Sequence, residues 1–149
     1  MTTENLVSRT HAEVSVGDEL PPLAIALTRT LIVATALATR DFQDVHHDPR
    51  LAADKGSPDI FMNILTSNGL VGRYITDWAG PEAELRKVAI RLGAPNYPGD
   101  TMTLTGTVTA KTTAEDGTPL VEIAVVGANK LGNHVTGTVT VKLPEGAEA

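Results

Sequence analysis

Two side chains capable of acid–base chemistry, Asp41 and His46, stand five residues apart in this chain. They lie in a nine-residue run, residues 40–48, that holds three carboxylates and two imidazoles. A helix that ends between them, or a turn, would aim both side chains at one water molecule. Two titratable groups that share a water form a general acid–base device, so Asp41 and His46 are the candidate catalytic residues.

Two other interpretations of this run remain open. Asp and His are common in solvated surface loops, and Asp48-Pro49 is itself a turn or helix-start signal. The triplet His46-His47-Asp48 contains metal-ligand types, but neighbouring side chains seldom point the same way, and a metal would need a further ligand from elsewhere. The remaining histidines, His11 and His134, stand alone in the sequence. We therefore predict no metal site.

The composition narrows the class of protein. A chain of 149 residues has the length of one domain. Its net charge of -6, without a cluster of Lys and Arg, argues against a nucleic-acid partner. Cys is absent, so disulfides and thiol nucleophiles are excluded, which fits a cytoplasmic protein. Residues 1–15 contain no continuous apolar stretch, so we expect no signal peptide and no membrane association.

The segments before and after the acidic run predict one strand and three helices. Residues 16–22 have the pattern of a turn that leads into ordered structure, and residues 23–31 are rich in β-forming types. An Ala-rich short helix over 32–39 would deliver the chain to Asp41, and a second short helix follows Asp48 over 49–53. Apolar residues between Ile60 and Trp78 recur with helical spacing, which predicts a long central helix.

Four strands are predicted in the rest of the chain. Turn signals at 97–100, 115–119 and Gly132-Asn133 separate alternating segments. One strand, a long helix and four antiparallel strands define an α+β domain in which the helix covers one face of the sheet. The two ends, residues 1–15 and 144–149, are predicted to be disordered. The four expected strands cover residues 87–92, 101–109, 120–126 and 135–143.

This order of elements resembles the hotdog fold of MaoC-like (R)-specific enoyl-CoA hydratases, in which an antiparallel sheet wraps around a long central helix. The hydratase motif of that family runs Gly-Asp-x-Asn-Pro-x-His-x-Asp, with Ala four residues after the last Asp. The chain matches it at Asp41, His46, Asp48 and Ala52, and 98–100 match the later Pro-Gly-Asp turn of the family. It departs from the family at Arg40 (family Gly), Gln43 (Asn), Asp44 (Pro) and 61–63 (usually containing His-Gly).

A longer set of segments resembles one subgroup of the family. This subgroup is the small MaoC subunit of the actinobacterial hydratase that acts on a steroid side-chain CoA thioester in cholesterol degradation. In it the small subunit carries the Asp/His pair and joins a second MaoC-domain subunit, as a heterodimer or heterotetramer. The matching segments are 38–48, 59–61, 63–66, Tyr74 and 76–80.

The resemblance implies hydration of an enoyl-CoA thioester by Asp41 and His46. It also implies that CoA enters as part of the substrate and that no separate cofactor is required. Gln43 and Asp48 are expected to orient the pair. Backbone amides at the start of the central helix, near Met62 and Asn63, are expected to meet the negative charge that develops on the thioester oxygen.

Other functions remain open at this point. The chain could be a non-catalytic hotdog subunit that stabilises a catalytic partner, or it could hydrate ordinary fatty enoyl-CoA as a homodimer. A hotdog acyl-CoA thioesterase would usually need an acidic residue on the central helix, and Asp77 lies too near the end of that helix. The lone Trp78 is expected to be a half-buried packing residue.

Overall fold

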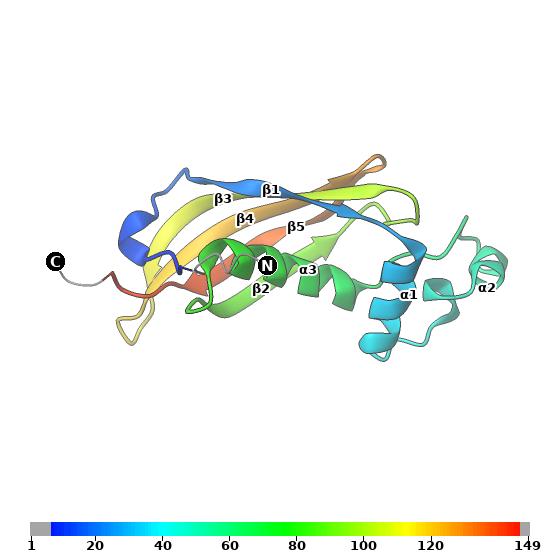
Figure 1. The fold of residues 1–149 in the computed structure, drawn as a ribbon, viewed down its shortest axis with the longest axis horizontal. Helices are drawn as coiled ribbons and strands as arrows, with labels where there is room; N and C mark the ends of the chain where they lie inside the picture. Colours follow the sequence, from blue (N-terminus) through cyan, green and yellow to red (C-terminus); the bar gives the residue numbers. More distant parts are fainter. Residues whose placement is uncertain (1–6, 147–149) are drawn as a thin grey trace.

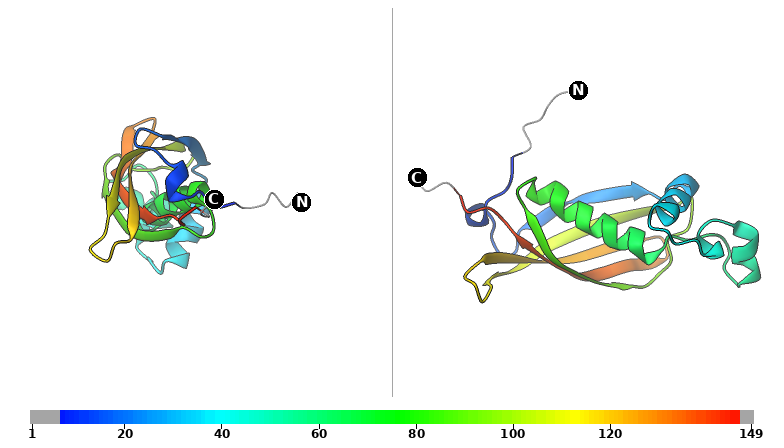
Figure 2. Two further views of the ribbon diagram at one scale, coloured as in Figure 1. Left: turned by 90° about the vertical axis from the view of Figure 1, so that its left-hand side faces the viewer. Right: turned by 90° about the horizontal axis from the view of Figure 1, so that it is seen from below.

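A five-stranded antiparallel sheet curls around one long helix, and the computed structural model describes residues 7–146 of the chain (Figure 1). The strand order is β1-β3-β4-β5-β2, so β1 and β2 form the two edges. The strands are β1 (Glu19–Ala26), β2 (Glu84–Leu92), β3 (Thr101–Thr113), β4 (Pro119–Asn129) and β5 (Gly132–Lys142). The predicted α+β arrangement is confirmed, because helix α3 (Ile64–Ala79) lies along the concave face of this sheet (Figure 2).

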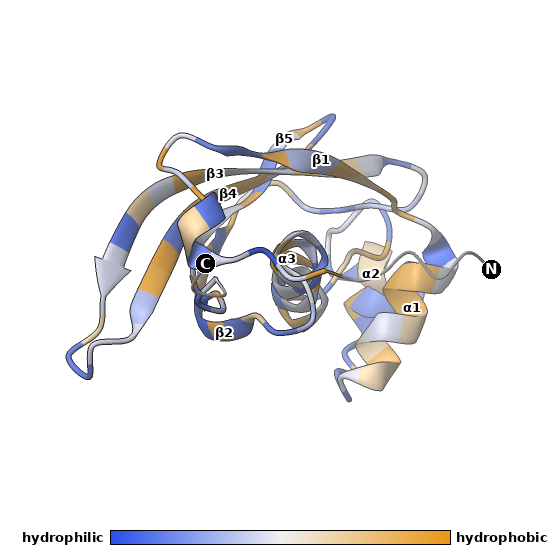
Figure 3. Cartoon of the chain, turned by 60° about the vertical axis from the view of Figure 1, so that its left-hand side comes forward, coloured by the Kyte–Doolittle hydropathy of each residue, from blue (hydrophilic) through white to orange (hydrophobic). Residues whose placement is uncertain are grey.

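The core forms between α3 and the sheet. Buried residues recur along α3 at Val71, Ile75 and Ala79, which is the spacing that places side chains on one helix face. Figure 3 shows α3 nearly end-on, with strands on both sides of it. The buried residues of the sheet that belong to the same apolar cluster include Leu104, Val108, Val121, Ile123, Val139 and Val141.

The central helix begins at Ile64, not at Ile60 as the apolar pattern suggested. The Asn63 side chain caps it by accepting a hydrogen bond from the Thr66 amide at 3.0 Å. The preceding segment is held in other contacts, since the Phe61 amide donates to the Val45 carbonyl at 3.0 Å. Apolar spacing alone does not reveal such a cap, which is why the predicted boundary was early.

The first strand begins earlier in the sequence than predicted. It begins at Glu19 and contains Pro21 and Pro22, which we had assigned to a turn. An edge strand tolerates Pro because one of its sides needs no ladder hydrogen bonds, and the register here shifts between Leu20 and Leu23. The strand ends at Ala26, so the prediction of strand for residues 27–31 was wrong.

Residues 29–31, predicted as strand, instead form the first turn of helix α1 (Arg29–Ala38). The Thr28 hydroxyl accepts a hydrogen bond from the Leu31 amide at 3.0 Å and so caps α1 at its first turn. Two shorter elements follow, the 3₁₀ turn η2 (Asp44–His46) and helix α2 (Pro49–Asp54). All three lie at one end of the molecule, near the N-terminus of α3 (Figure 2).

The described parts of the two termini pack at the opposite end. Residues 7–15, for which we expected disorder, include the 3₁₀ turn η1 (His11–Glu13). The Arg9 amide donates to the Ala79 carbonyl at 2.8 Å, and the His11 amide donates to the Pro144 carbonyl at 2.9 Å. Residues 1–6 and 147–149, also predicted to be disordered, lie outside the described residues.

The turn between β4 and β5 is formed by residues 130–131, two positions before the predicted Gly132-Asn133. Within residues 7–146, no helix combines the length and apolar character needed to cross a membrane.

Candidate active site

Asp41 and His46 face one another in the folded chain, as predicted. The Oδ2 atom of Asp41 lies 3.3 Å from the Nε2 atom of His46. The side chain of His46 is 7% exposed and that of Asp41 is 16% exposed. Two titratable groups thus meet in a largely dehydrated place that still opens to the surface, which is the arrangement expected of an acid–base pair.

The end of α1 fixes the position of Asp41. The Arg40 amide donates to the Leu37 carbonyl at 3.0 Å, and the Asp41 amide donates to the Ala36 carbonyl at 2.9 Å. These two bonds form a Schellman motif, in which the residue after the helix adopts a left-handed conformation. Arg40 does so with φ 57°, at the position where the hydratase motif has Gly. Asp41 therefore leaves the helix in a fixed direction.

His46 is held from the opposite side. Its Nδ1 atom lies 2.7 Å from the carbonyl oxygen of Phe61, and only a protonated nitrogen can donate to that oxygen. The Phe61 ring contacts the imidazole edge-on, with ring centroids 5.1 Å apart. In the neutral imidazole the lone pair is therefore on Nε2, the nitrogen that faces Asp41.

The pair opens into a pocket of ≈ 310 Å³ at the N-terminus of α3. This volume is at the lower end of the range of small-molecule sites. The lining residues come from the 41–46 segment, from residues 61–64, from the end of β2 and the loop after it, and from the start of β5. They are Asp41, Gln43, His46, Phe61, Met62, Asn63, Ile64, Leu92, Gly93, Pro95 and His134.

His134 is a pocket residue that the sequence analysis left unassigned. It is 2% exposed, its Nδ1 atom lies 2.7 Å from the Ala94 carbonyl oxygen, and its Nε2 atom lies 2.7 Å from the Ser67 hydroxyl. Burial lowers the pKa of His134, which favours the neutral imidazole. No local signal marks this residue, because pairing of β2 with β5 is what brings it beside the start of α3.

The other two carboxylates of the 40–48 run have structural partners. Asp48 was expected to orient the catalytic pair, but its carboxylate accepts hydrogen bonds from the Arg50 and Leu51 amides and caps α2. The hydrogen bond from the Leu51 amide is the main cause that lowers the pKa of Asp48. Asp44 forms an ion pair with Lys55 at 2.9 Å. Neither group is bonded to Asp41 or His46.

Gln43 contacts the pair through its backbone. Its amide lies 3.4 Å from the Oδ1 atom of Asp41, a long hydrogen bond, and its carbonyl oxygen accepts from the His46 amide at 3.0 Å. The orienting contact predicted for Gln43 is therefore made by the main chain, while its side chain is exposed at the pocket.

The expected oxyanion donors are only partly available. The Met62 amide donates to the Asn96 carbonyl oxygen at 3.1 Å, so the prediction of a free amide at Met62 was wrong. The first-turn amides of α3, those of Ile64 and Leu65, have no acceptor within the helix. They lie at the positive end of a 16-residue helix, and Ile64 lines the pocket.

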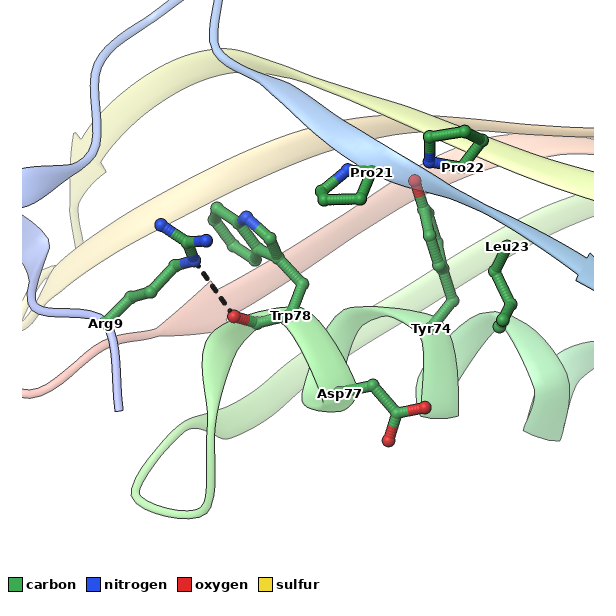
Figure 4. Close-up of a pocket in the computed structure, with 7 residues that line it drawn as sticks. All are labelled: Arg9, Pro21, Pro22, Leu23, Tyr74, Asp77 and Trp78. Carbon is green, nitrogen blue, oxygen red and sulfur yellow. Dashed lines mark hydrogen bonds between the residues drawn. The ribbon is translucent and has the colours of Figure 1, made fainter. Parts of the chain in front are cut away.

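A second pocket, of ≈ 280 Å³, lies between β1 and the C-terminal half of α3. Figure 4 shows Tyr74 and Trp78 projecting from α3 toward Pro21 and Pro22 of β1. Trp78 is half-buried, as predicted, and the Arg9 guanidinium lies 5.3 Å from the centre of its ring.

The acidic residue of the thioesterase alternative lies at this second pocket. Asp77 forms an ion pair with Arg73 at 3.1 Å and does not line the pocket that contains Asp41. Among the described residues, no three His, Asp or Glu side chains are grouped so that they could hold a metal ion.

Comparison with known proteins identifies a close relative. The chain is 55% identical over 128 residues to the 3-oxo-4,17-pregnadiene-20-carboxyl-CoA hydratase beta subunit of Mycobacterium tuberculosis, covering 86% of this chain and 95% of that protein. No family model matches the sequence.

Solved structures agree with this relationship. A chain in the crystal structure of the ChsH1-ChsH2 complex from Mycobacterium tuberculosis superposes with a TM-score of 0.80 at 54% identity, over 87% of this chain and 98% of that one. The (R)-hydratase PhaJ1 from Pseudomonas aeruginosa has the same fold, with a TM-score of 0.82 at 21% identity, over 93% of this chain and 87% of that one. The chain belongs to the MaoC-like enoyl-CoA hydratase family and has its hotdog fold.

Proposed function

We propose that this protein is a MaoC-type enoyl-CoA hydratase that adds water to the side-chain double bond of a steroid enoyl-CoA thioester. The observation that carries the proposal is the 3.3 Å approach of Asp41 Oδ2 to His46 Nε2 at a pocket. A non-catalytic subunit has no need to keep a carboxylate and an imidazole aligned, since burying polar groups costs free energy unless they are well paired.

The proposed reaction uses one water held between Asp41 and His46. One member of the pair removes a proton from the water as its oxygen bonds to the β-carbon of the substrate. The electron pair of the double bond moves toward the thioester, and the α-carbon then receives a proton. The product is a 3-hydroxyacyl-CoA. No electron is gained or lost overall, so the proposed reaction needs no redox cofactor. In the proposal, Asp41 and His46 activate the water without a metal.

The second requirement of this reaction is a group that stabilises the negative charge that develops on the thioester oxygen. The free amides of Ile64 and Leu65 at the start of α3 are suited to stabilise that charge, because they add hydrogen-bond donors to the positive end of the helix dipole. This assignment replaces the Met62 amide, which is bonded to Asn96.

The substrate class is supported by the relative at 55% identity, whose name specifies a pregnadiene-carboxyl-CoA. A second MaoC-domain subunit is supported by the ChsH1-ChsH2 complex, which contains the 54% identical chain. Large apolar side chains near the pocket are exposed here, among them Phe42 at 65% and Ile64 at 53%, and a second subunit would cover them. We also propose that the protein is cytoplasmic.

The test uses the chain alone and together with its co-purified MaoC partner subunit, identified by mass spectrometry. Each sample is incubated with a steroid side-chain enoyl-CoA and with a linear fatty enoyl-CoA. Loss of enoyl absorbance without release of free CoA, faster with the steroid substrate, is expected. Release of free CoA would indicate a thioesterase. Hydration that survives mutation of both Asp41 and His46 would indicate a non-catalytic subunit.

A further inference from the structure

The Asn63 carboxamide links three parts of the candidate site. It is a 2% exposed polar residue. Its Nδ2 atom lies 3.1 Å from Asp41 Oδ2 and 2.9 Å from the Thr39 hydroxyl oxygen. Its Oδ1 atom accepts from the Thr66 amide at 3.0 Å, and the Thr66 hydroxyl also contacts it. One side chain therefore joins the end of α1, the candidate catalytic carboxylate and the first turn of α3.

The chemistry of its neighbours determines which way the amide points. The Thr66 backbone N–H can only donate, so the Asn63 atom that faces it must be the oxygen. On the other side, the Thr39 hydroxyl contacts the Thr35 and Ala36 carbonyl oxygens at 2.9 Å and 3.0 Å. Its single proton is used there, so it accepts from Asn63. The Asn63 nitrogen thus faces both Thr39 and the carboxylate of Asp41.

This contact has a consequence for the acid–base pair. The oxygen that receives the Asn63 N–H, Asp41 Oδ2, is also the oxygen nearest to His46 Nε2. A carboxylate can rotate about its Cβ–Cγ bond, and a fixed donor at one oxygen restricts that rotation. The contact also stabilises negative charge on the oxygen that faces the imidazole.

We propose that Asn63 is a positioning residue of the hydratase site. Its side-chain nitrogen holds Asp41 toward His46, while its side-chain oxygen caps α3. This inference rests on the proposed function. It differs from the sequence-based expectation, which assigned to Asn63 only a backbone amide near the thioester oxygen.

The substitution Asn63→Asp separates the two roles. Asp caps a helix as well as Asn does, so the bond to the Thr66 amide is kept. The donor to Asp41 is replaced by a second carboxylate, and two adjacent carboxylates disfavour ionisation of both. Thr66→Val is the matched control, because it weakens the contact at the cap and leaves the Asn63–Asp41 contact intact.

The rate of enoyl-CoA hydration by the complex of this chain with its partner subunit is measured as a function of pH. Asn63→Asp is expected to lower kcat by about ten- to a hundredfold near neutral pH and to move the acid side of the pH–rate profile to higher pH, with KM little changed. Thr66→Val is expected to leave the profile in place. A wild-type kcat and profile in Asn63→Asp would overturn the proposal.

Melting temperatures supply a readout that needs no activity. In Asn63→Asp the loss of melting temperature is expected to grow as pH rises from about 5 to about 8, because the two folded-state carboxylates repel when both are ionised. In Thr66→Val the loss should not depend on pH. If the wild-type complex hydrates no enoyl-CoA, the proposed function fails, and the melting comparison still decides whether Asn63 holds Asp41. A pH-independent loss in Asn63→Asp would refute that contact.

Discussion

The imidazole of His46 donates through Nδ1 to the carbonyl oxygen of Phe61 across 2.7 Å. This bond leaves the opposite nitrogen, Nε2, directed at the Asp41 carboxylate. A backbone carbonyl oxygen can accept but cannot donate, so this contact identifies Nδ1 as the protonated nitrogen.

Removal of either member of the pair should abolish most hydration. Asp41→Asn and His46→Gln are each expected to reduce kcat by about a hundred- to ten-thousandfold, because each deletes a positioned proton acceptor or donor. The rate is followed by loss of enoyl absorbance. Asp44→Asn is the matched control for the carboxylate, since Asp44 lies in the same run but forms an exposed pair with Lys55. Near-normal turnover in either pair variant would contradict the assignment.

The left-handed conformation of Arg40 should cost stability that Gly recovers. With φ 57°, a side chain at this position is strained, while Gly is not. Arg40→Gly is expected to be more stable than Arg40→Ala by about 1 kcal/mol in urea unfolding. Both variants remove the same guanidinium, so the comparison isolates the backbone. Equal stability of the two variants would mean that this conformation is not kept in solution.

Replacement of Gly69 by Ala should stabilise the isolated chain. A Cβ atom at Gly69 would meet nothing within 4 Å, so Gly69→Ala is expected to raise the free energy of unfolding by about 1 kcal/mol through helix propensity. Gly72→Ala should gain less, because its Cβ would lie 3.4 Å from the Leu85 side chain. Chemical denaturation measures both. If Gly69→Ala also weakens assembly with the partner subunit, Gly69 packs closely against the partner in the complex.

His134 should make stability depend on pH. Burial keeps its folded-state pKa below the ordinary value of 6.5, so below that pH the unfolded chain binds a proton that the folded chain does not. Stability is therefore lost as pH falls from 6.5 toward the lowered pKa, by at most about 1.4 kcal/mol per pH unit. His134→Gln should lose less stability than wild type between about pH 7 and pH 5 in urea unfolding. Ser67→Ala, which keeps the buried imidazole, should still lose stability as the pH falls through this range. An unchanged dependence in His134→Gln would show that another group is responsible.

Much of the fold was predictable because its signals are local. The alternating segments after Gly80 became β2 to β5, and the apolar spacing between residues 60 and 78 became α3. Boundaries were less accurate where a cap or an edge position decided them. Thr28 and Asn63 begin helices that propensity did not delimit, and β1 accepts two Pro residues because it lies at the edge of the sheet.

The candidate site was also predictable only where its signals are local. The sequence by itself indicated that Asp41 and His46 could meet, because they are only five positions apart. In the structure α1 ends just before Asp41, and the 3₁₀ turn η2 ends at His46. Asp48-Pro49 was a local helix-start signal, and the Asp48 cap agrees with it. Only the tertiary structure decided that the Met62 amide is occupied and that Asn63 and His134 line the pocket. Asn63 lies 22 residues from Asp41, and His134 lies 67 residues from Ser67. Hydrogen bonds over such separations form only when α3 is packed into the curled sheet and β5 is paired with β2, and short-range patterns carry no record of that packing.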